Sequence, residues 1–108
     1  MATELTSTEM IPEITARIVR AFHPAKIILF GSHARGDARA DSDIDLLVVL
    51  RHVDDGRRAA AAVLDLLTDL TVAVDAIVVT PEELERFGDR SGTVLRPALR
   101  EGRVLYAA

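Results

Sequence analysis

One stretch of the chain, residues 30–50, reads FGSHARGDARADSDIDLLVVL. It joins a Gly31-Ser32 turn, which follows an apolar segment, to Asp43 and Asp45 at the start of a second apolar segment. Side chains alternate between the two faces of a strand, so Asp43 and Asp45 are expected to project from the same face. Two neighbouring carboxylates repel each other unless positive charge lies between them. The stretch therefore predicts a turn and a strand that meet at a strongly polar site.

The residue types at this junction indicate which ligands the site suits. Mg²⁺ prefers hard oxygen ligands and usually binds one or two carboxylates together with substrate phosphates. A Gly-Ser turn offers backbone N–H groups and a hydroxyl that can approach a phosphate closely. The pattern predicts that Asp43 and Asp45 hold metal while Gly31 and Ser32 contact a phosphorylated substrate.

The two halves of the stretch also resemble a known motif. The nucleotidyltransferase superfamily of the DNA polymerase β type carries Gly-Ser or Gly-Gly, a gap of about ten residues, and two acidic residues separated by one apolar residue. The closer resemblance is to the minimal nucleotidyltransferases (MNT), which include antitoxins of the MntA type and whose hallmark is GSxARG followed by SDIDL. This chain has GSHARG at residues 31–36 and SDIDL at residues 42–46.

The resemblance implies roles for individual residues. It implies two Mg²⁺ ions held by Asp43, Asp45 and a third carboxylate described below, with ATP as the substrate. It implies that the hydroxyl of Ser32 donates to a β- or γ-phosphate oxygen, although Ser32 is equally suited to cap a helix. Arg35 is expected to pair with the triphosphate; the alternative is that it holds the loop against Asp37.

A third carboxylate, Asp75, lies in the apolar segment TVAVDAIVV, residues 71–79. Burying an unpaired carboxylate in a strand costs several kcal/mol, so a role in metal binding or in accepting a proton is favoured over a purely structural role. Members of the superfamily carry a third acidic residue on a later strand, and the resemblance implies that Asp75 binds metal and serves as the general base. The alternative is a buried partner for an arginine.

Three further residues of the motif region are given structural roles. His33 occupies the variable position of the hallmark and is expected to be exposed. Ser42 is expected to cap or orient the start of the second strand. Arg39 is expected to be a solvated loop residue.

Composition limits the classes of function. The 108 residues suit a single domain, residues 1–108, and no segment is long and apolar enough to span a membrane. The N-terminus has no secretory pattern and the chain has no cysteine, so a cytoplasmic location is the default expectation. A net charge of −4 and an aromatic content of 4% argue against extended nucleic-acid binding.

The periodicity of apolar residues and the capping signals predict an alternating order of elements. Helices are expected from the capping box at residues 6–9 to the residues before Pro24, and at residues 57–70, 81–87 and 94–101, with a loop over 88–92; strands are expected at residues 26–30, 43–50, 71–79 and 104–106. This order is typical of an α/β (α+β) fold with a small mixed β-sheet and helices packed on one side. The resemblance implies the palm-like core of nucleotidyltransferases.

Two classes of function are compatible with this pattern. The first is an enzyme that transfers AMP from ATP to a hydroxyl; MNT proteins commonly act as antitoxins of HEPN-type ribonuclease toxins, so the resemblance implies a HEPN-type toxin as the acceptor. The second is a non-catalytic antitoxin that neutralises its partner by contact. Transfer to a small molecule is a further alternative. The presence of Asp43, Asp45, Asp75 and the Gly31-Ser32 turn favours the enzyme.

Overall fold

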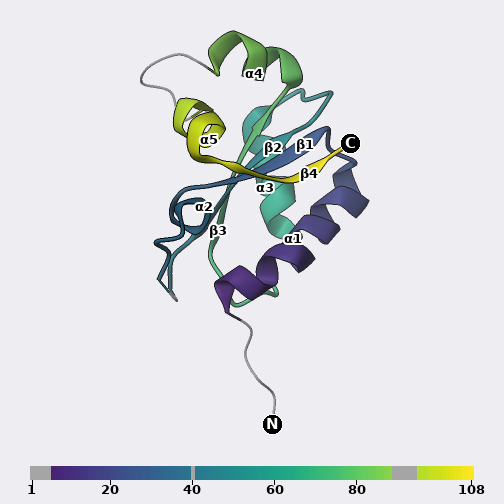
Figure 1. The fold of residues 1–108 in the computed structure, drawn as a ribbon. Helices are drawn as coiled ribbons and strands as arrows, with labels where there is room; N and C mark the ends of the chain where they lie inside the picture. Colours follow the sequence, from purple (N-terminus) through teal and green to yellow (C-terminus); the bar gives the residue numbers. More distant parts are fainter. Residues whose placement is uncertain (1–5, 40, 89–94) are drawn as a thin grey trace.

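The computed structural model describes residues 6–39, 41–88 and 95–108. Helices and strands alternate along the chain (Figure 1). The helices are α1 (Ser7–Phe22), α2 (Ser32–Arg35), α3 (Gly56–Asp65), α4 (Pro81–Phe87) and α5 (Leu95–Glu101). The strands are β1 (Lys26–Phe30), β2 (Ile44–Val49), β3 (Val74–Val79) and β4 (Arg103–Ala107).

The four strands form one sheet in the order β3-β2-β1-β4. Strand β1 pairs antiparallel with both β2 and β4, and β2 pairs parallel with β3. The parallel pair needs a crossover connection, and α3 lies within it. The predicted mixed sheet is therefore confirmed.

Helices cover both faces of this sheet, so the prediction that they pack on one side was wrong. Helices α1 and α3 share a core with Ile27, Leu46 and Val48 on one face. On the other face, α5 and side chains of α4 pack against Ile28 and Leu47. Figure 1 shows the sheet between these two helical layers. The central strand β2 is buried on both faces because its apolar run supplies side chains to both cores.

Local sequence signals set the helix starts where they were predicted. Thr6 and Glu9 form a capping box at the start of α1, in which the Thr6 hydroxyl accepts from the Glu9 backbone N–H. Thr80 and Glu83 do the same at α4, which begins at Pro81. These reciprocal bonds satisfy N–H groups that have no partner within the helix.

The segment after α3 differs from the prediction of one helix over residues 57–70. Helix α3 ends at Asp65, and the following turns bond i to i+3, as in the bond from the Leu70 N–H to the Leu67 carbonyl at 3.1 Å. The Leu66 carbonyl accepts from Arg17 instead of from a fourth residue along the chain. Strand β3 accordingly begins at Val74. The loop predicted over residues 88–92 lies mostly outside the described residues.

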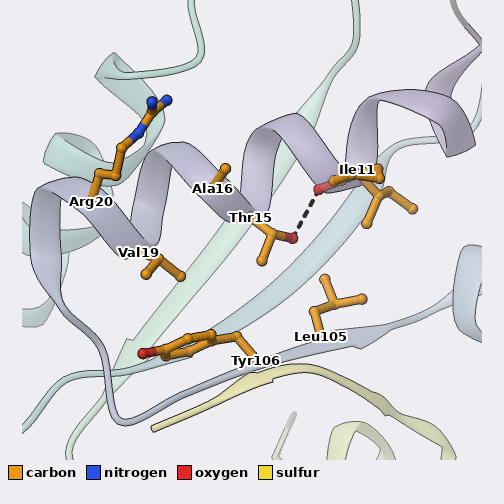
Figure 2. A pocket seen from close by; sticks show the side chains of 8 residues that line it. Ile11, Thr15, Ala16, Val19, Arg20, Leu105 and Tyr106 are labelled. Atoms are coloured by element: carbon orange, nitrogen blue, oxygen red, sulfur yellow. Dashed lines mark hydrogen bonds between the residues drawn. The ribbon is translucent and has the colours of Figure 1, made fainter.

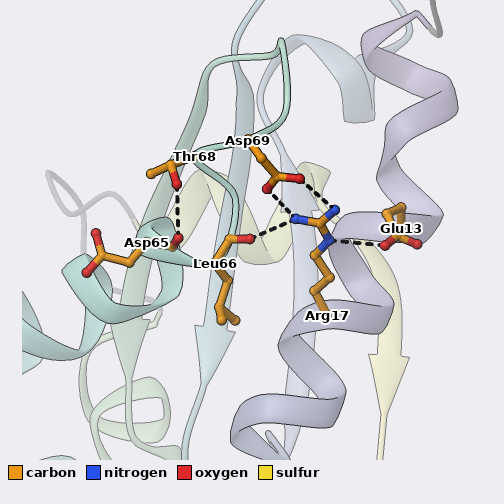
Figure 3. Close-up of polar contacts among 6 residues, drawn as sticks. All are labelled: Glu13, Arg17, Asp65, Leu66, Thr68 and Asp69. Atoms are coloured by element: carbon orange, nitrogen blue, oxygen red, sulfur yellow. Dashed lines mark hydrogen bonds and ion pairs between the residues drawn. The ribbon is translucent and has the colours of Figure 1, made fainter.

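Arg17 joins α1 to this turn through the Leu66 carbonyl and the Asp69 carboxylate, and it also contacts Glu13 within α1 (Figure 3). Its guanidinium donates to Leu66 O at 2.9 Å, to both carboxylate oxygens of Asp69 at 2.6 and 3.1 Å, and to Glu13 Oε1 at 3.0 Å. The bidentate contact holds the pKa of Asp69 below its ordinary value. The planar fork of an arginine bonds both oxygens of a carboxylate while its other N–H groups reach further acceptors, a geometry that the compact ammonium of a lysine does not reproduce.

We expect Arg17→Lys to lower the melting temperature by a few degrees, because the ammonium keeps the charge but loses the simultaneous contacts. Arg20→Lys, at an exposed arginine on the same helix, is the control and should leave the melting temperature unchanged. Because the contribution of Asp69 depends on its ionised form, the Arg17→Lys difference should persist above about pH 4 and disappear as the pH falls below it. Equal melting curves for the two variants at pH 7 would contradict this role.

Candidate functional site

The sheet register brings the predicted carboxylates to one level. Asp45 on β2 is paired with Phe30 at the end of β1 and with Asp75 near the start of β3. Paired residues on adjacent strands project from the same face. Asp45 and Asp75 therefore share the face that α4 and α5 cover further along the strands, and α2 begins directly after Phe30 at this end of the sheet (Figure 1).

The Gly31 backbone lies directly against the carboxylate of Asp45. Gly31 has a φ of +75°, and a Cβ built there would overlap Asp45 Oδ2 and lie 3.2 Å from Asp45 Cγ. Only glycine combines this backbone conformation with the absence of a side chain. The turn and the acidic strand, which lie apart in the sequence, are therefore in contact at this point.

Asp45 is a carboxylate whose ionised form is disfavoured by its surroundings in the site. Its side chain is partly buried, and burial raises its pKa above the ordinary value; the negative charges of Asp75 and Asp43 raise the pKa further. Arg35 and His33 act in the opposite direction but do not outweigh these effects. A carboxylate held among like charges is stabilised when a cation binds there.

Asp43 and Asp75 are both exposed. The prediction that Asp75 is buried was wrong, and with it the alternative of a buried arginine partner. The reason is that β3 is the edge strand, and burial along it increases only toward its other end. Its position beside Asp45 does follow the prediction, because the strand after β2 forms the parallel neighbour.

Ser32 is the first residue of α2, and Gly31 is the N-cap, so Ser32 does not cap the helix. Arg35 makes ion pairs with Asp37, at 3.4 Å from Nε to Oδ2, and with Glu101 of α5, at 3.5 Å from Nη1 to Oε2. The contact with Asp37 is the alternative that the sequence left open. The pairing with Glu101 had no signal in the sequence, because it joins two segments that only the fold brings together.

His33 is buried, and the prediction that it is exposed was wrong. Its Nδ1 lies 3.3 Å from Thr8 Oγ1 and its Nε2 lies 3.2 Å from Ser42 O. The short helix α2 turns this ring inward under α1. The hydroxyl of Ser42 accepts from the Arg39 N–H at 2.7 Å, within the loop before β2.

Mg²⁺ requires hard oxygen ligands in a nearly octahedral arrangement. Within the part of the chain that the structure describes, no three His, Cys, Asp or Glu side chains are grouped closely enough to hold a metal ion. The oxygen ligands of Asp43 and Asp45 nevertheless suit Mg²⁺, which commonly takes one or two protein carboxylates and completes its shell with phosphate and water. The chemistry of the residues fits the ion, and their roles as ligands stay predictions.

A groove of about 520 Å³ lies on the opposite face, between α1 and β4 (Figure 2). Its lining is mostly apolar and includes Ile11, Val19, Leu105 and Tyr106. The hydroxyl of Thr15 in this groove is already bonded to the Ile11 carbonyl at 2.8 Å. This groove lacks the carboxylates that a metal-bound triphosphate requires, so it is distinct from the candidate site.

None of the helices in the described residues is long and apolar enough to cross a membrane.

Comparisons with known proteins identify the family of this chain. The family model of the nucleotidyltransferase domain matches residues 11–105. A Methanocaldococcus jannaschii protein named "Putative protein adenylyltransferase MJ0604" is 44% identical in an alignment of 86 residues that covers 75% of this chain and 77% of that protein. The chain belongs to the nucleotidyltransferase family and is a nucleotidyltransferase.

Solved structures show the same fold. A crystal structure described as a putative nucleotidyltransferase from Sulfolobus solfataricus aligns with a TM-score of 0.65 at 22% identity, over 93% of this chain and 79% of that chain. A second, described as a toxin-antitoxin with AMP-PNP, aligns with a TM-score of 0.63 at 22% identity, over 91% and 74%. A third, of the toxin-antitoxin MntA-HpeT, also has a TM-score of 0.63 at 22% identity, over 90% and 72%.

We expect Gly31→Ala to destroy nucleotide binding while leaving a folded protein, because the new methyl group displaces the Asp45 carboxylate. Gly36→Ala is a matched control: Gly36 has a φ of +85°, but a Cβ there meets nothing within 4 Å. Gly36→Ala should lose about 1–2 kcal/mol to the left-handed backbone. Gly31 combines its positive φ with a ψ of −155°, a region that is essentially restricted to glycine, so Gly31→Ala should lose about 1–3 kcal/mol to the backbone. Overlap with Asp45 should cost Gly31→Ala about 1–3 kcal/mol more. Denaturant unfolding and calorimetry with Mg²⁺ and ATP measure the two effects; equal behaviour of the variants would contradict the contact.

We expect Asp45→Asn to raise the melting temperature at neutral pH by a few degrees, because it removes a charge that the folded state disfavours. Since the pKa of Asp45 is raised, its ionisation costs stability above that pKa, and the cost vanishes below the unfolded-state pKa of about 4. The gain should therefore disappear in melts below about pH 4. Asp41→Asn, at an exposed carboxylate in the preceding loop, is the control. A gain of the same size from Asp41→Asn would point to net charge instead.

Proposed function

We propose that this protein transfers AMP from ATP to a hydroxyl of a partner protein in a Mg²⁺-dependent reaction, and that it is the antitoxin of a toxin-antitoxin pair with a HEPN-type toxin. The observation that carries the proposal is the Asp45 carboxylate, held against Gly31 and between Asp43 and Asp75. The name of the Methanocaldococcus jannaschii relative supports a protein acceptor, and the toxin-antitoxin structures support the class of partner.

Each residue of the site has its own role in the proposed transfer. Asp43 and Asp45 would hold Mg²⁺, which neutralises the triphosphate and lowers the pKa of the attacking hydroxyl. Gly31 and Ser32 bind the phosphate tail through backbone N–H groups and the Ser32 hydroxyl. The acceptor oxygen forms a bond to the α-phosphorus, the bond from that phosphorus to the bridging oxygen breaks, and pyrophosphate leaves. Asp75, or a water beside it, takes the proton of the hydroxyl.

The exposure of Asp75 supports an acceptor that comes from outside the chain. A general base must lie within hydrogen-bond reach of the proton that it removes. On the edge strand β3, Asp75 is open to a hydroxyl carried by another protein. Arg35 is a second point of contact with the substrate in this proposal: its ion pairs with Asp37 and Glu101 are exposed and are therefore weak enough to be exchanged for a triphosphate.

A non-catalytic antitoxin that acts by contact alone remains the competing function. The carboxylates favour catalysis, because Asp45 is kept in an unfavourable electrostatic position that a binding module would not need. Transfer to a small molecule is the other alternative, and it differs only in the acceptor.

We expect Asp45→Asn to abolish transfer and to weaken ATP binding in the presence of Mg²⁺. Asp75→Asn should still bind ATP but transfer about 10²–10⁴-fold more slowly, the range for loss of a general base. Asp41→Asn should behave as wild type. The assay uses labelled ATP and the co-purified product of the neighbouring gene, with mass spectrometry to locate AMP on a tyrosine, serine or threonine.

The outcomes separate the functions. AMP on the partner that depends on Asp43 and Asp45 supports the proposal. Neutralisation of the partner with no added mass, with Mg²⁺ and every nucleoside triphosphate present, favours the non-catalytic antitoxin. Label on a small molecule and none on the partner would overturn the protein acceptor. Wild-type rates in Asp45→Asn would overturn the carboxylate site itself.

A further inference from the structure

His33 is the buried polar side chain of the described residues, at 8% exposure, and none of the roles above uses it. Both ring nitrogens have partners: Nδ1 lies 3.3 Å from Thr8 Oγ1 and Nε2 lies 3.2 Å from Ser42 O. The ring therefore connects the first turn of α1 to the residue immediately before Asp43.

The identity of the acceptors determines the tautomer. A backbone carbonyl can only accept, so Nε2 carries the hydrogen and donates to Ser42 O. In the neutral ring, Nδ1 is then the acceptor, and the Thr8 hydroxyl donates to it. The Ser42 carbonyl thus sets the tautomer, and the Thr8 hydroxyl can satisfy the remaining nitrogen because it is able to donate.

The bond to Ser42 bears directly on Asp43. The Ser42 carbonyl and the Asp43 N–H belong to one planar peptide group, so fixing the carbonyl also fixes the plane from which Asp43 departs. The other polar groups of Ser42 are held as well, because its N–H donates to Arg39 O at 3.0 Å and its hydroxyl accepts from the Arg39 N–H. His33 supplies the restraint that comes from outside this loop.

The position of His33 in the chain gives the restraint its use. His33 follows Ser32 in α2, so its backbone moves with the turn that is proposed to hold the triphosphate, while its ring holds the start of the acidic strand. One side chain thereby sets the spacing between the two halves of the site across the loop of residues 36–42.

We propose that His33 is a positioning residue, whose Nε2–H bond to Ser42 O aligns the Asp43 carboxylate with the Gly31-Ser32 turn for transfer. This inference rests on the proposed function for its kinetic consequence, but the restraint on the loop exists without it. The competing explanation is a buried histidine that contributes to stability only.

Two amide substitutions separate these explanations. In His33→Gln, the side-chain nitrogen occupies the place of Nε2 and can still donate to Ser42 O. In His33→Asn, the amide is shorter, occupies the place of Nδ1 and can contact only Thr8. Both variants bury an amide at the same position, so a purely structural histidine predicts similar losses in both.

We expect His33→Asn to lower kcat by about 10–100-fold, the scale for a misplacement of about 1 Å, with a smaller change in KM for ATP. His33→Gln should restore kcat to within a few-fold of wild type. Rates are compared well below both melting temperatures. Equal losses of kcat in the two variants, or losses that follow the melting temperatures, would overturn the positioning role.

A second measurement does not depend on activity. Amide hydrogen exchange of residues 37–43 should be faster in His33→Asn than in wild type, and His33→Gln should exchange as wild type does. Nitrogen chemical shifts of the ring should show the proton on Nε2. If the wild type transfers no AMP but the exchange pattern holds, the proposed function fails and the restraint stands. If exchange in His33→Asn equals that in wild type, the inference itself fails.

Discussion

The register of three strands is the constraint on which the site depends. The antiparallel pairing of β1 with β2 and the parallel pairing of β2 with β3 have registers that bring Phe30, Asp45 and Asp75 to one level of the sheet. A shift of one residue in β2 would turn Asp45 toward the core of α1 and α3 and expose Ile44 or Leu46 in its place. Burial of the alternate apolar residues therefore fixes the register, and the register in turn places the carboxylates.

The same arrangement has a cost in stability. Asp45 is partly buried, close to two like charges and in contact with the Gly31 backbone, so the folded protein disfavours its ionised form. A bound cation would relieve that repulsion in part. The two cores on either side of β2, each with apolar side chains from helices and strands, provide the stability that tolerates such a site.

Much of this architecture could be predicted because it depends on local signals. The capping boxes at Thr6 and Thr80 and the strand over residues 26–30 were found from neighbouring residues alone. The carboxylate pairing followed from the spacing of Asp43 and Asp45 and from the order of the strands. Which residues bind metal or phosphate stays a prediction.

The failures have a common physical origin, because each depends on contacts between distant segments. Exposure of Asp75 follows from the edge position of β3, which the chain order does not specify. Burial of His33 requires Thr8 and Ser42 to lie on either side of the ring. Helix α3 ends early at the point where the Leu66 carbonyl accepts a hydrogen bond from Arg17 of α1. The second helical layer depends on the contact of α5 with β1. In the sequence, only the nearly continuous apolar run of β2 indicated that both faces of the sheet are covered.

Strand β2 also shows how two kinds of selection can act within six residues. Its even-numbered members, Ile44, Leu46 and Val48, face the core of α1 and α3, while Asp45 faces the site. Cores tolerate apolar exchanges that conserve volume, so the even positions are free to drift among Ile, Leu and Val. An apolar residue at Asp45 would remove the negative charge of the site. Apolar exchanges at Ile44, Leu46 and Val48 can therefore change the stability of the fold while Asp45, on the opposite face of the strand, keeps its place in the site.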